Sequence, residues 1–136
     1  MDPLPPAILL VEDDPDDVML FKRALRKVRP DTDLAVARDG DEAVEILSKG
    51  EGRVSPSHVI LDLKLPRRSG LEVVEWIRDR YGRGGMQVVI LTSSQQAEDL
   101  EWARRAGVER YHVKPPNFTE LVEMIRRILT DWHLLP

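Results

Sequence analysis

The chain alternates short apolar runs with segments of helical periodicity, and this alternation restricts its fold more than any other feature. Five largely aliphatic and β-branched runs occur at positions 7–11, 34–37, 58–62, 87–92 and 110–113. Neighbouring parallel strands need a crossover connection, and a helix supplies it. Strands that are covered on both faces are expected to be apolar along their length. We therefore predict an α/β fold, a doubly wound (βα)₅ sandwich on one parallel sheet.

The segments between the runs carry helix signals. The first begins with Asp14 as N-cap and Pro15 at the first helical position, and the last begins at Asn117. The fourth is predicted to begin after Ser94 and to end at Gly107, a typical C-terminal stop. The apolar positions predicted to face the core are Val18, Phe21, Leu25 and Val28, then Ala43, Val44 and Leu47, then Leu71, Val74 and Ile77, then Ala97, Leu100 and Ala103, and finally Leu121, Ile125 and Ile128.

Length and composition favour one soluble domain. With 136 residues, 42% of them hydrophobic and 32% charged, we expect a single domain over 1–136, with a core at about 7–131 and a short tail at 132–136. No apolar run approaches the roughly 20 residues of a membrane span, and the N-terminus does not resemble a signal peptide. We expect a cytoplasmic protein without membrane contact. So few residues follow the last predicted helix that we expect no output domain.

Charge and cysteine content exclude other classes of function. The net charge is −4 and neither end carries a block of Lys and Arg, so we expect no nucleic-acid binding. The chain has no cysteine, which excludes disulfides, thiolate metal sites and thiol catalysis.

Acidic residues follow two of the predicted strands. Glu12 and Asp13 come after the first strand, and Asp62 ends the third. In the strand order 2-1-3-4-5 these strands are neighbours about 4.8 Å apart, and ligands bind doubly wound sheets at the carboxyl ends of their strands. The three carboxylates should converge, and a hard divalent cation would relieve their repulsion. The sequence therefore predicts a magnesium site, beside which an oxygen of Asp62 can attack phosphorus.

Two further strand ends offer groups that a phosphoryl group needs. Thr92 closes the fourth strand with a hydroxyl, and Lys114 follows the fifth. Lys114 lies two strand spacings from Asp62, about 10 Å, a gap that a four-carbon side chain can largely cover. We expect both residues to contact the phosphoryl group of an aspartyl phosphate.

These residues resemble the signature of the response-regulator receiver domains of two-component signalling. The resemblance extends over about residues 8–130 and includes the pair Glu12-Asp13, Asp62, Thr92 and the Lys114-Pro115 pair, with Pro66 and Gly70 at the family's spacing after Asp62. It implies a flavodoxin-like fold and a signalling switch, not an enzyme in the usual sense. A histidine kinase would phosphorylate Asp62, and the phosphorylated chain would change its affinity for a downstream protein.

The resemblance also implies roles for single residues. Asp13 and Asp62 would bind Mg²⁺ directly, Glu12 would act mainly through water, and the backbone carbonyl of Lys64 would complete the protein ligands. Thr92 would move toward the phosphoryl group while Tyr111, the switch aromatic, turns inward. The residues 11–18 and the ending 131–136 resemble the small regulators that serve bacterial and cyanobacterial phytochromes, so a bacteriophytochrome is the kinase that this narrower resemblance implies.

Some positions depart from the commonest family pattern. The acidic pair is Glu-Asp instead of Asp-Asp, and Pro116 after Lys114-Pro115 is unusual. Lys64 and Ser94 occupy positions that tune the phosphoryl lifetime in the family, so the lifetime here is open.

Simpler interpretations compete with several of these assignments. Thr92 and Tyr111 are also ordinary strand residues. Asp16 and Asp17 are interpreted as first-turn residues that the helix dipole favours, outside the site. Trp76 and Trp102 are interpreted as boundary packing, and the three histidines show no ligand spacing.

Two alternative functions remain beside the switch. A phosphatase or phosphotransferase with an aspartyl nucleophile would carry Asp two residues after Asp62, where this chain has Lys64. A receiver-like scaffold that is never phosphorylated would not need the full set of acids, hydroxyl and lysine.

The tail allows two alternatives. Trp132, Leu134 and Leu135 lie beyond the apolar stripe of the last helix. Exposed, they would form an interface for a homodimer through the predicted fourth helix, fifth strand and fifth helix. Otherwise the tail folds back onto its own domain.

Overall fold

The structure, a computed structural model, describes residues 7–49, 57–82, 85–108 and 110–135. Its strands are β1 (Ala7–Val11), β2 (Asp33–Ala37), β3 (His58–Leu61), β4 (Gln87–Thr92) and β5 (Arg110–Val113). Its helices are α1 (Pro15–Val28), α2 (Gly40–Ser48), α3 (Gly70–Tyr81), α4 (Ala97–Arg105) and α5 (Phe118–Asp131). The N-terminal residues 1–6, for which no signal peptide was expected, lie outside the described ranges.

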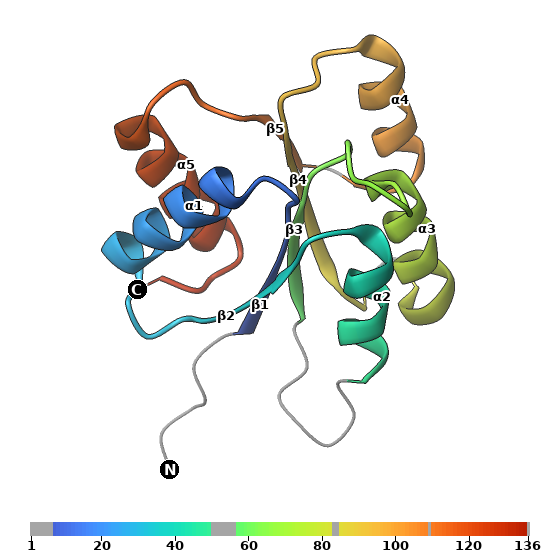
Figure 1. The fold of residues 1–136 in the computed structure, drawn as a ribbon, viewed down its shortest axis with the longest axis horizontal. Helices are drawn as coiled ribbons and strands as arrows, with labels where there is room; N and C mark the ends of the chain where they lie inside the picture. The colour runs from blue at the N-terminus through green and yellow to red at the C-terminus, as the bar shows by residue number, and fades with distance from the viewer. Residues whose placement is uncertain (1–6, 50–56, 83–84, 109, 136) are drawn as a thin grey trace.

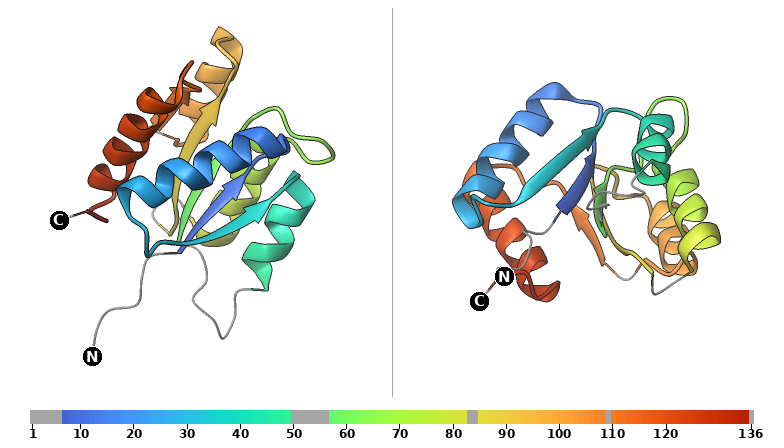
Figure 2. Two further views of the ribbon diagram at one scale, coloured as in Figure 1. Left: turned by 60° about the vertical axis from the view of Figure 1, so that its left-hand side comes forward. Right: turned by 90° about the horizontal axis from the view of Figure 1, so that it is seen from below.

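The five strands form one parallel sheet in the order β2-β1-β3-β4-β5. The predicted doubly wound (βα)₅ fold and strand order are confirmed. Figure 1 shows α1 and α5 on one side of the sheet and α2, α3 and α4 on the other, and Figure 2 shows the same layers from two further directions. Among the described residues no helix has both the length and the apolar character of a membrane span.

The alternation of side chains along each strand fills two cores. In β1, Ile8 and Leu10 face α1 and α5, whereas Leu9 and Val11 face α2, α3 and α4. All four side chains are buried. Because both faces are covered, the strands are apolar almost without interruption, which is the pattern that indicated a parallel sheet.

Local signals set the helix ends. The Asp14 carboxylate accepts hydrogen bonds from the N–H groups of Asp16 and Asp17, and Asn117 accepts one from the N–H of Glu120. At the end of α4, Gly107 has φ +82°, and Val108 N–H donates to the carbonyl of Ala103 at 3.0 Å. This is the left-handed C-terminal turn that the glycine predicted.

The predicted burial of α4 is wrong at two of its three positions. Ala103 is 1% exposed, but Leu100 is 44% exposed and Ala97 is also exposed. The helix begins at Ala97 and packs on the core mainly through its C-terminal turn, and Figure 1 shows its N-terminal end reaching past the strands. The periodicity of an amphipathic helix does not tell how much of its length the sheet covers.

The tail folds back onto its own domain. Trp132 is buried against the core beneath α1 and α5, and its ring lies 4.7 Å from the ring of His58, centre to centre. Leu134 and Leu135 pack on the same core, and the guanidinium of Arg29 donates to the carbonyl of Leu134. Of the two alternatives for the tail, the structure shows the second, with Trp132 buried and Leu134 and Leu135 half-buried.

Candidate phosphoacceptor and metal site

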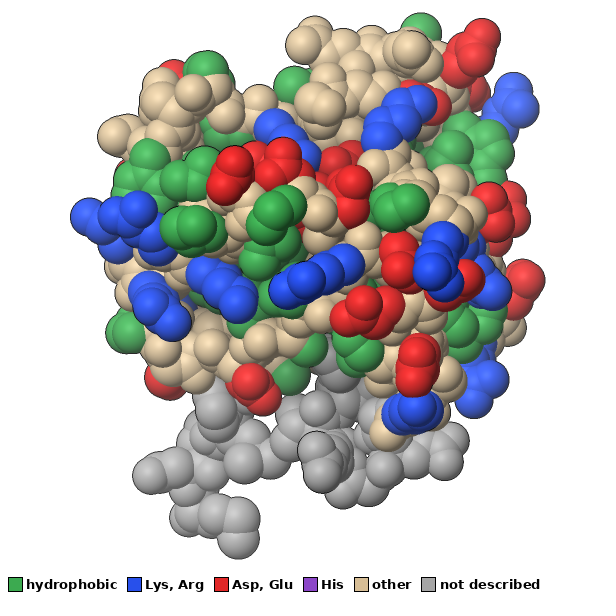
Figure 3. All heavy atoms as spheres, in the orientation of Figure 1, with side chains coloured by type: hydrophobic (Ala, Val, Ile, Leu, Met, Phe, Trp, Pro, Cys, Tyr) green, Lys and Arg blue, Asp and Glu red, His purple; other side chains and the backbone are tan. Residues whose placement is uncertain are grey.

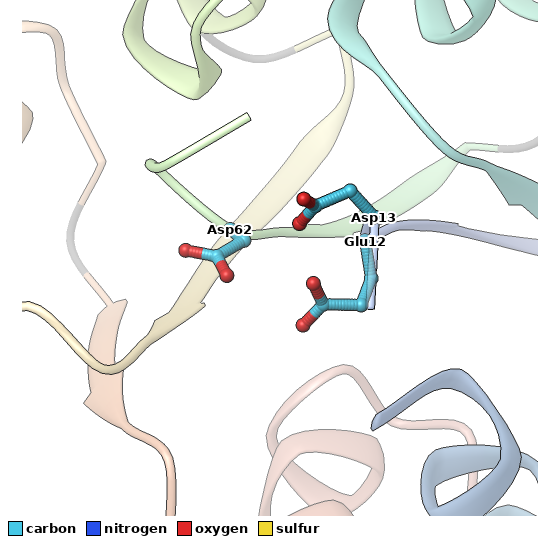
Figure 4. A group of neighbouring side chains, drawn as sticks. All are labelled: Glu12, Asp13 and Asp62. Atoms are coloured by element: carbon cyan, nitrogen blue, oxygen red, sulfur yellow. The ribbon is translucent and has the colours of Figure 1, made fainter. Parts of the chain in front are cut away.

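The acidic residues meet where β1 and β3 end. Val11 pairs with Leu61 across these strands, and the N–H of Asp62 donates to the carbonyl of Val11 at 3.1 Å, so the ladder continues into the site. Glu12, Asp13 and Asp62 each place a carboxylate oxygen within 4.8 Å of the others. Figure 4 shows the side chains of Glu12 and Asp13, after β1, directed toward Asp62 after β3. The predicted convergence of the three carboxylates is confirmed.

The three carboxylates differ in their contact with water. Glu12 and Asp62 are 4% and 5% exposed, whereas Asp13 is exposed. Burial raises the pKa of Glu12 to about 7, although the nearby Lys114 ammonium and the N–H of Asp14 oppose this increase. Carboxylate oxygens are the donors that hard divalent cations prefer, so this set fits Mg²⁺.

Lys114 brings a positive charge to the reacting carboxylate. Its N–H donates to the carbonyl of Thr92 at 2.9 Å, which continues the β4–β5 ladder by one residue and directs its side chain to the site. The ammonium Nζ lies 2.9 Å from Asp62 Oδ2 and 2.8 Å from Asp17 Oδ2, and it also pairs with Glu12 Oε1. Burial alone would lower the pKa of Lys114, but the three carboxylates outweigh it and raise that pKa above its ordinary value.

The second oxygen of Asp62 accepts two hydrogen bonds. The hydroxyl of Thr92, which is fully buried, donates to Asp62 Oδ1 at 2.5 Å. The backbone N–H of Lys64 donates to the same oxygen at 3.2 Å. Asp62 is thus held on one side by an ammonium and on the other by a hydroxyl and an amide.

A hydrogen-bonded group links the site to α4 and β5. The Tyr111 hydroxyl donates to the carbonyl of Ser94 at 3.0 Å, and burial raises the pKa of Tyr111. The Ser94 hydroxyl donates to Asp99 Oδ2 at 2.6 Å, and the Lys64 ammonium lies 3.4 Å from that oxygen. Lys64 and Ser94 are therefore joined through Asp99 in the first turn of α4.

A cavity of about 180 Å³ opens beside Asp62 and Lys114. It lies between α1 and the segment that leads from β5 into α5, and its apolar lining includes Leu20, Pro116 and Phe118. Acidic side chains gather near the start of α1 and the strand ends, as Figure 3 shows. Exposed members of this group are Asp13, Asp14 and Asp16.

The structure brings Glu12, Asp13, Asp62, Thr92 and Lys114 together, whereas Tyr111 contacts Ser94, and two further residues, Asp17 and Asp99, contact these groups. Asp17, interpreted as a first-turn residue outside the site, does lie in the first turn of α1, but its carboxylate also reaches Lys114. No local sequence pattern indicates this contact, because it depends on the pitch and direction of α1. Asp99 has no local signal either, because its contact with Ser94 depends on where α4 begins.

Residues 8–126 match the family model of the response regulator receiver domain. Two sequence relatives span most of the chain. The probable methanogenesis regulatory protein FilR2 of Methanothrix harundinacea is 35% identical over 127 residues, which cover 92% of this chain and 82% of FilR2. Response regulator Rcp1 of Synechocystis is 32% identical over 131 residues, which cover 94% of this chain and 89% of Rcp1.

Solved structures give the same result. The Mn²⁺-bound form of Rcp1 matches with a TM-score of 0.81 over 94% of each chain. The phosphorylated cyanobacterial phytochrome response regulator RcpA matches with a TM-score of 0.82 and 30% identity over 94% of each chain. With its fold, its strand-end acids and these similarities, the chain belongs to the response regulator receiver domains of two-component signalling.

Proposed function

We propose that this receiver domain is a phosphoryl-accepting switch with Asp62 as its phosphoacceptor. The observation that carries this proposal is that Asp62 is buried yet holds an ammonium on one oxygen and a hydroxyl on the other. Such donors match the charge that a transferred phosphoryl group brings. On this proposal 1–136 acts as one receiver unit.

In the proposed transfer, an oxygen of Asp62 attacks the phosphorus of a phosphohistidine on a sensor kinase. A P–O bond forms as the P–N bond breaks, and the imidazole leaves with the electron pair of that bond. The Lys114 ammonium and the Thr92 hydroxyl then donate to phosphoryl oxygens, because both already lie within hydrogen-bond distance of Asp62. Mg²⁺ held by Glu12, Asp13, Asp62 and the backbone carbonyl of Lys64 would offset the charge of the phosphoryl group.

The proposed output is a change of protein binding through α4, β5 and α5. Thr92 and Tyr111 are the proposed switch residues, and Tyr111 reaches the carbonyl of Ser94, two residues from Thr92. The N–H of Ser94 donates to the Thr92 hydroxyl, and the Ser94 hydroxyl donates to Asp99 in α4. A shift of Thr92 toward a phosphoryl group can therefore displace Ser94 and, through it, Asp99.

A phytochrome kinase is the proposed phosphoryl donor. This rests on the similarity to RcpA, which is a phytochrome response regulator, over 94% of each chain. The alternative of a phosphatase with an aspartyl nucleophile lacks support, because the side chain two residues after Asp62 is a lysine that pairs with Asp99. We propose a cytoplasmic phosphoacceptor, not an enzyme that acts on a separate substrate.

The test is phosphorylation by acetyl phosphate with Mg²⁺, measured by intact mass. We expect the parent chain to gain one phosphoryl group, Asp62→Asn to gain none, and EDTA to prevent the gain. Asp79→Asn, which changes an exposed carboxylate of α3, is the matched control and should react like the parent. A phosphorylated Asp62→Asn chain would contradict the assignment.

A further inference from the structure

Three carboxylates surround the Lys114 ammonium, one for each of its N–H bonds. An ammonium carries three N–H bonds, and in this structure it pairs with Glu12, Asp17 and Asp62. An incoming phosphoryl oxygen can therefore gain a hydrogen bond from Lys114 only if one of these carboxylates gives up its own.

The three carboxylates are not equally easy to displace. The side chains of Glu12 and Asp62 are 5% and 6% exposed, so losing the ammonium would leave a buried carboxylate without its cation. The side chain of Asp17 is 38% exposed, and water can replace the lysine there at little cost. Asp17 is thus the partner that gives up Lys114 most easily.

Asp17 also holds Lys114 from a different direction than the other two. Glu12 and Asp62 follow strands, whereas Asp17 lies in the first turn of α1, next to the cavity that opens on Asp62. Asp17 does not belong to the group of carboxylates that lie close enough to share a metal ion among the described residues. Its contact in the site is with the lysine.

We propose that Asp17 is a positioning residue that holds the Lys114 ammonium before phosphoryl transfer and releases it to the phosphoryl group. The inference rests on the proposed function of Asp62. Asp17 competes with the phosphoryl group for the Lys114 ammonium. Removing its carboxylate should therefore make phosphorylation faster.

The test compares initial rates of phosphorylation by acetyl phosphate across several donor concentrations. Asp17→Asn should react about two- to fivefold faster, the range that an ion pair open to solvent supports. Asp17→Glu keeps the charge and should restore a rate near that of the parent. Asp16→Asn removes the same charge from the same turn, where no Lys114 contact is present, and should change the rate less.

Repeating the comparison in a variant that lacks Lys114 separates competition for this lysine from simple repulsion between Asp17 and the anionic donor. In Lys114→Ala, adding Asp17→Asn should leave the rate unchanged, because the contact through which Asp17 acts is gone. The same acceleration in both backgrounds, or no acceleration in the parent background, would overturn the inference while leaving Asp62 as phosphoacceptor. A parent chain that gains no phosphoryl group would instead overturn the proposed function and this inference together.

Discussion

The carboxylates around Asp62 are chemically alike but differ in how much water they keep. Glu12 and Asp62 are buried, Asp17 is half-buried, and Asp13 is exposed. Burial disfavours a charge, whereas a nearby ammonium favours it. For Glu12, burial is the larger effect and raises its pKa to about 7, so this side chain changes charge near neutral pH.

This pKa predicts how stability depends on pH in the metal-free protein. The pKa of Glu12 rises from an ordinary 4.5 to about 7 on folding, so the folded chain binds a proton that the unfolded chain releases. The stabilisation is fully present below pH 4.5 and is lost as the pH rises through about 7. In urea unfolding with EDTA, we expect Glu12→Gln to gain stability relative to the parent between pH 5 and 8.

Comparing Glu12→Gln with the parent chain at each pH removes the contribution of the other titratable groups to stability. Burial lowers the pKa of His58 and of His112, and their contribution is lost as the pH falls, which is the opposite sign. Both histidines are present in the parent and in Glu12→Gln, so their effects cancel in the difference. A difference in stability that stays constant with pH would contradict the raised pKa of Glu12.

The sequence predicted which strand ends carry the site, but it did not predict that the Lys114 ammonium would contact Asp17 as well as Asp62. Glu12, Asp62 and Lys114 follow from strand order alone, because the carboxyl ends of parallel strands share one edge. The contact of Asp17 with Lys114 depends on the pitch and direction of α1, which no local pattern defines. Asp17 lies in the first turn of α1, as predicted, and also contacts Lys114, because the two roles do not exclude each other.

Among the helices, α3 fixes the loop that carries Asp62. The first residue of α3 is Gly70. It lies so close to this loop that an added Cβ would lie 2.1 Å from the Asp62 carbonyl oxygen and 2.7 Å from Leu63 Cα. The N–H of Gly70 also donates to the carbonyl of Leu63 at 3.1 Å. The start of α3 and the loop after β3 are therefore one packed unit.

Gly70→Ala should displace this unit and slow phosphorylation. Overpacking of this kind costs about 1–3 kcal/mol, and we expect a loss of that size in urea unfolding together with a lower rate with acetyl phosphate. Gly82→Ala, at the other end of α3, is the control. Its φ of +72° strains an alanine, but apart from its chain neighbours no described residue has an atom within 4 Å of the added Cβ. It should lose stability and keep the parent rate; equal loss of rate in both variants would contradict the argument.

The helices also show where periodicity stops being informative. In α5 the predicted Ile125 and Ile128 are buried, because the helix lies along the sheet over its length. In α4 the same kind of stripe leaves Leu100 exposed, because this helix extends past the strands. The sequence determines which face of a helix is apolar, and the tertiary arrangement determines how much of that face is covered.

For the domain as a whole, the tail after α5 belongs to the core. Trp132 is 8% exposed and packs on the ring of His58 at the start of β3, far along the chain from α5. Trp132→Ala should lower the free energy of unfolding by about 3 kcal/mol, as for other large buried side chains. His133→Asn is the control, since His133 is exposed and its φ of +59° suits asparagine. A cost for Trp132→Ala as small as that of the control would place the tail outside the core.

With Trp132 buried, we expect a homodimer of this chain to use side chains outside the tail. Leu100 on α4 and Val113 on β5 are 44% and 39% exposed. A two-fold pairing would bury two copies of each exposed apolar side chain at once, and pairs of this symmetry are the commonest oligomers. We therefore expect the proposed homodimer to use α4, β5 and α5 without the tail.

Light scattering of the chain, before and after treatment with acetyl phosphate, tests this expectation. Leu100→Asp should yield a monomer, because it places a charge on the α4 face proposed to pair while the fold loses little burial. Met19→Asp changes a side chain that is 54% exposed on α1, across the sheet from α4, and should leave the dimer intact. A parent chain that stays monomeric under both conditions removes the dimer. Equal weakening of the dimer by both variants would contradict an interface on α4, because only Leu100→Asp places its charge on the surface proposed to pair.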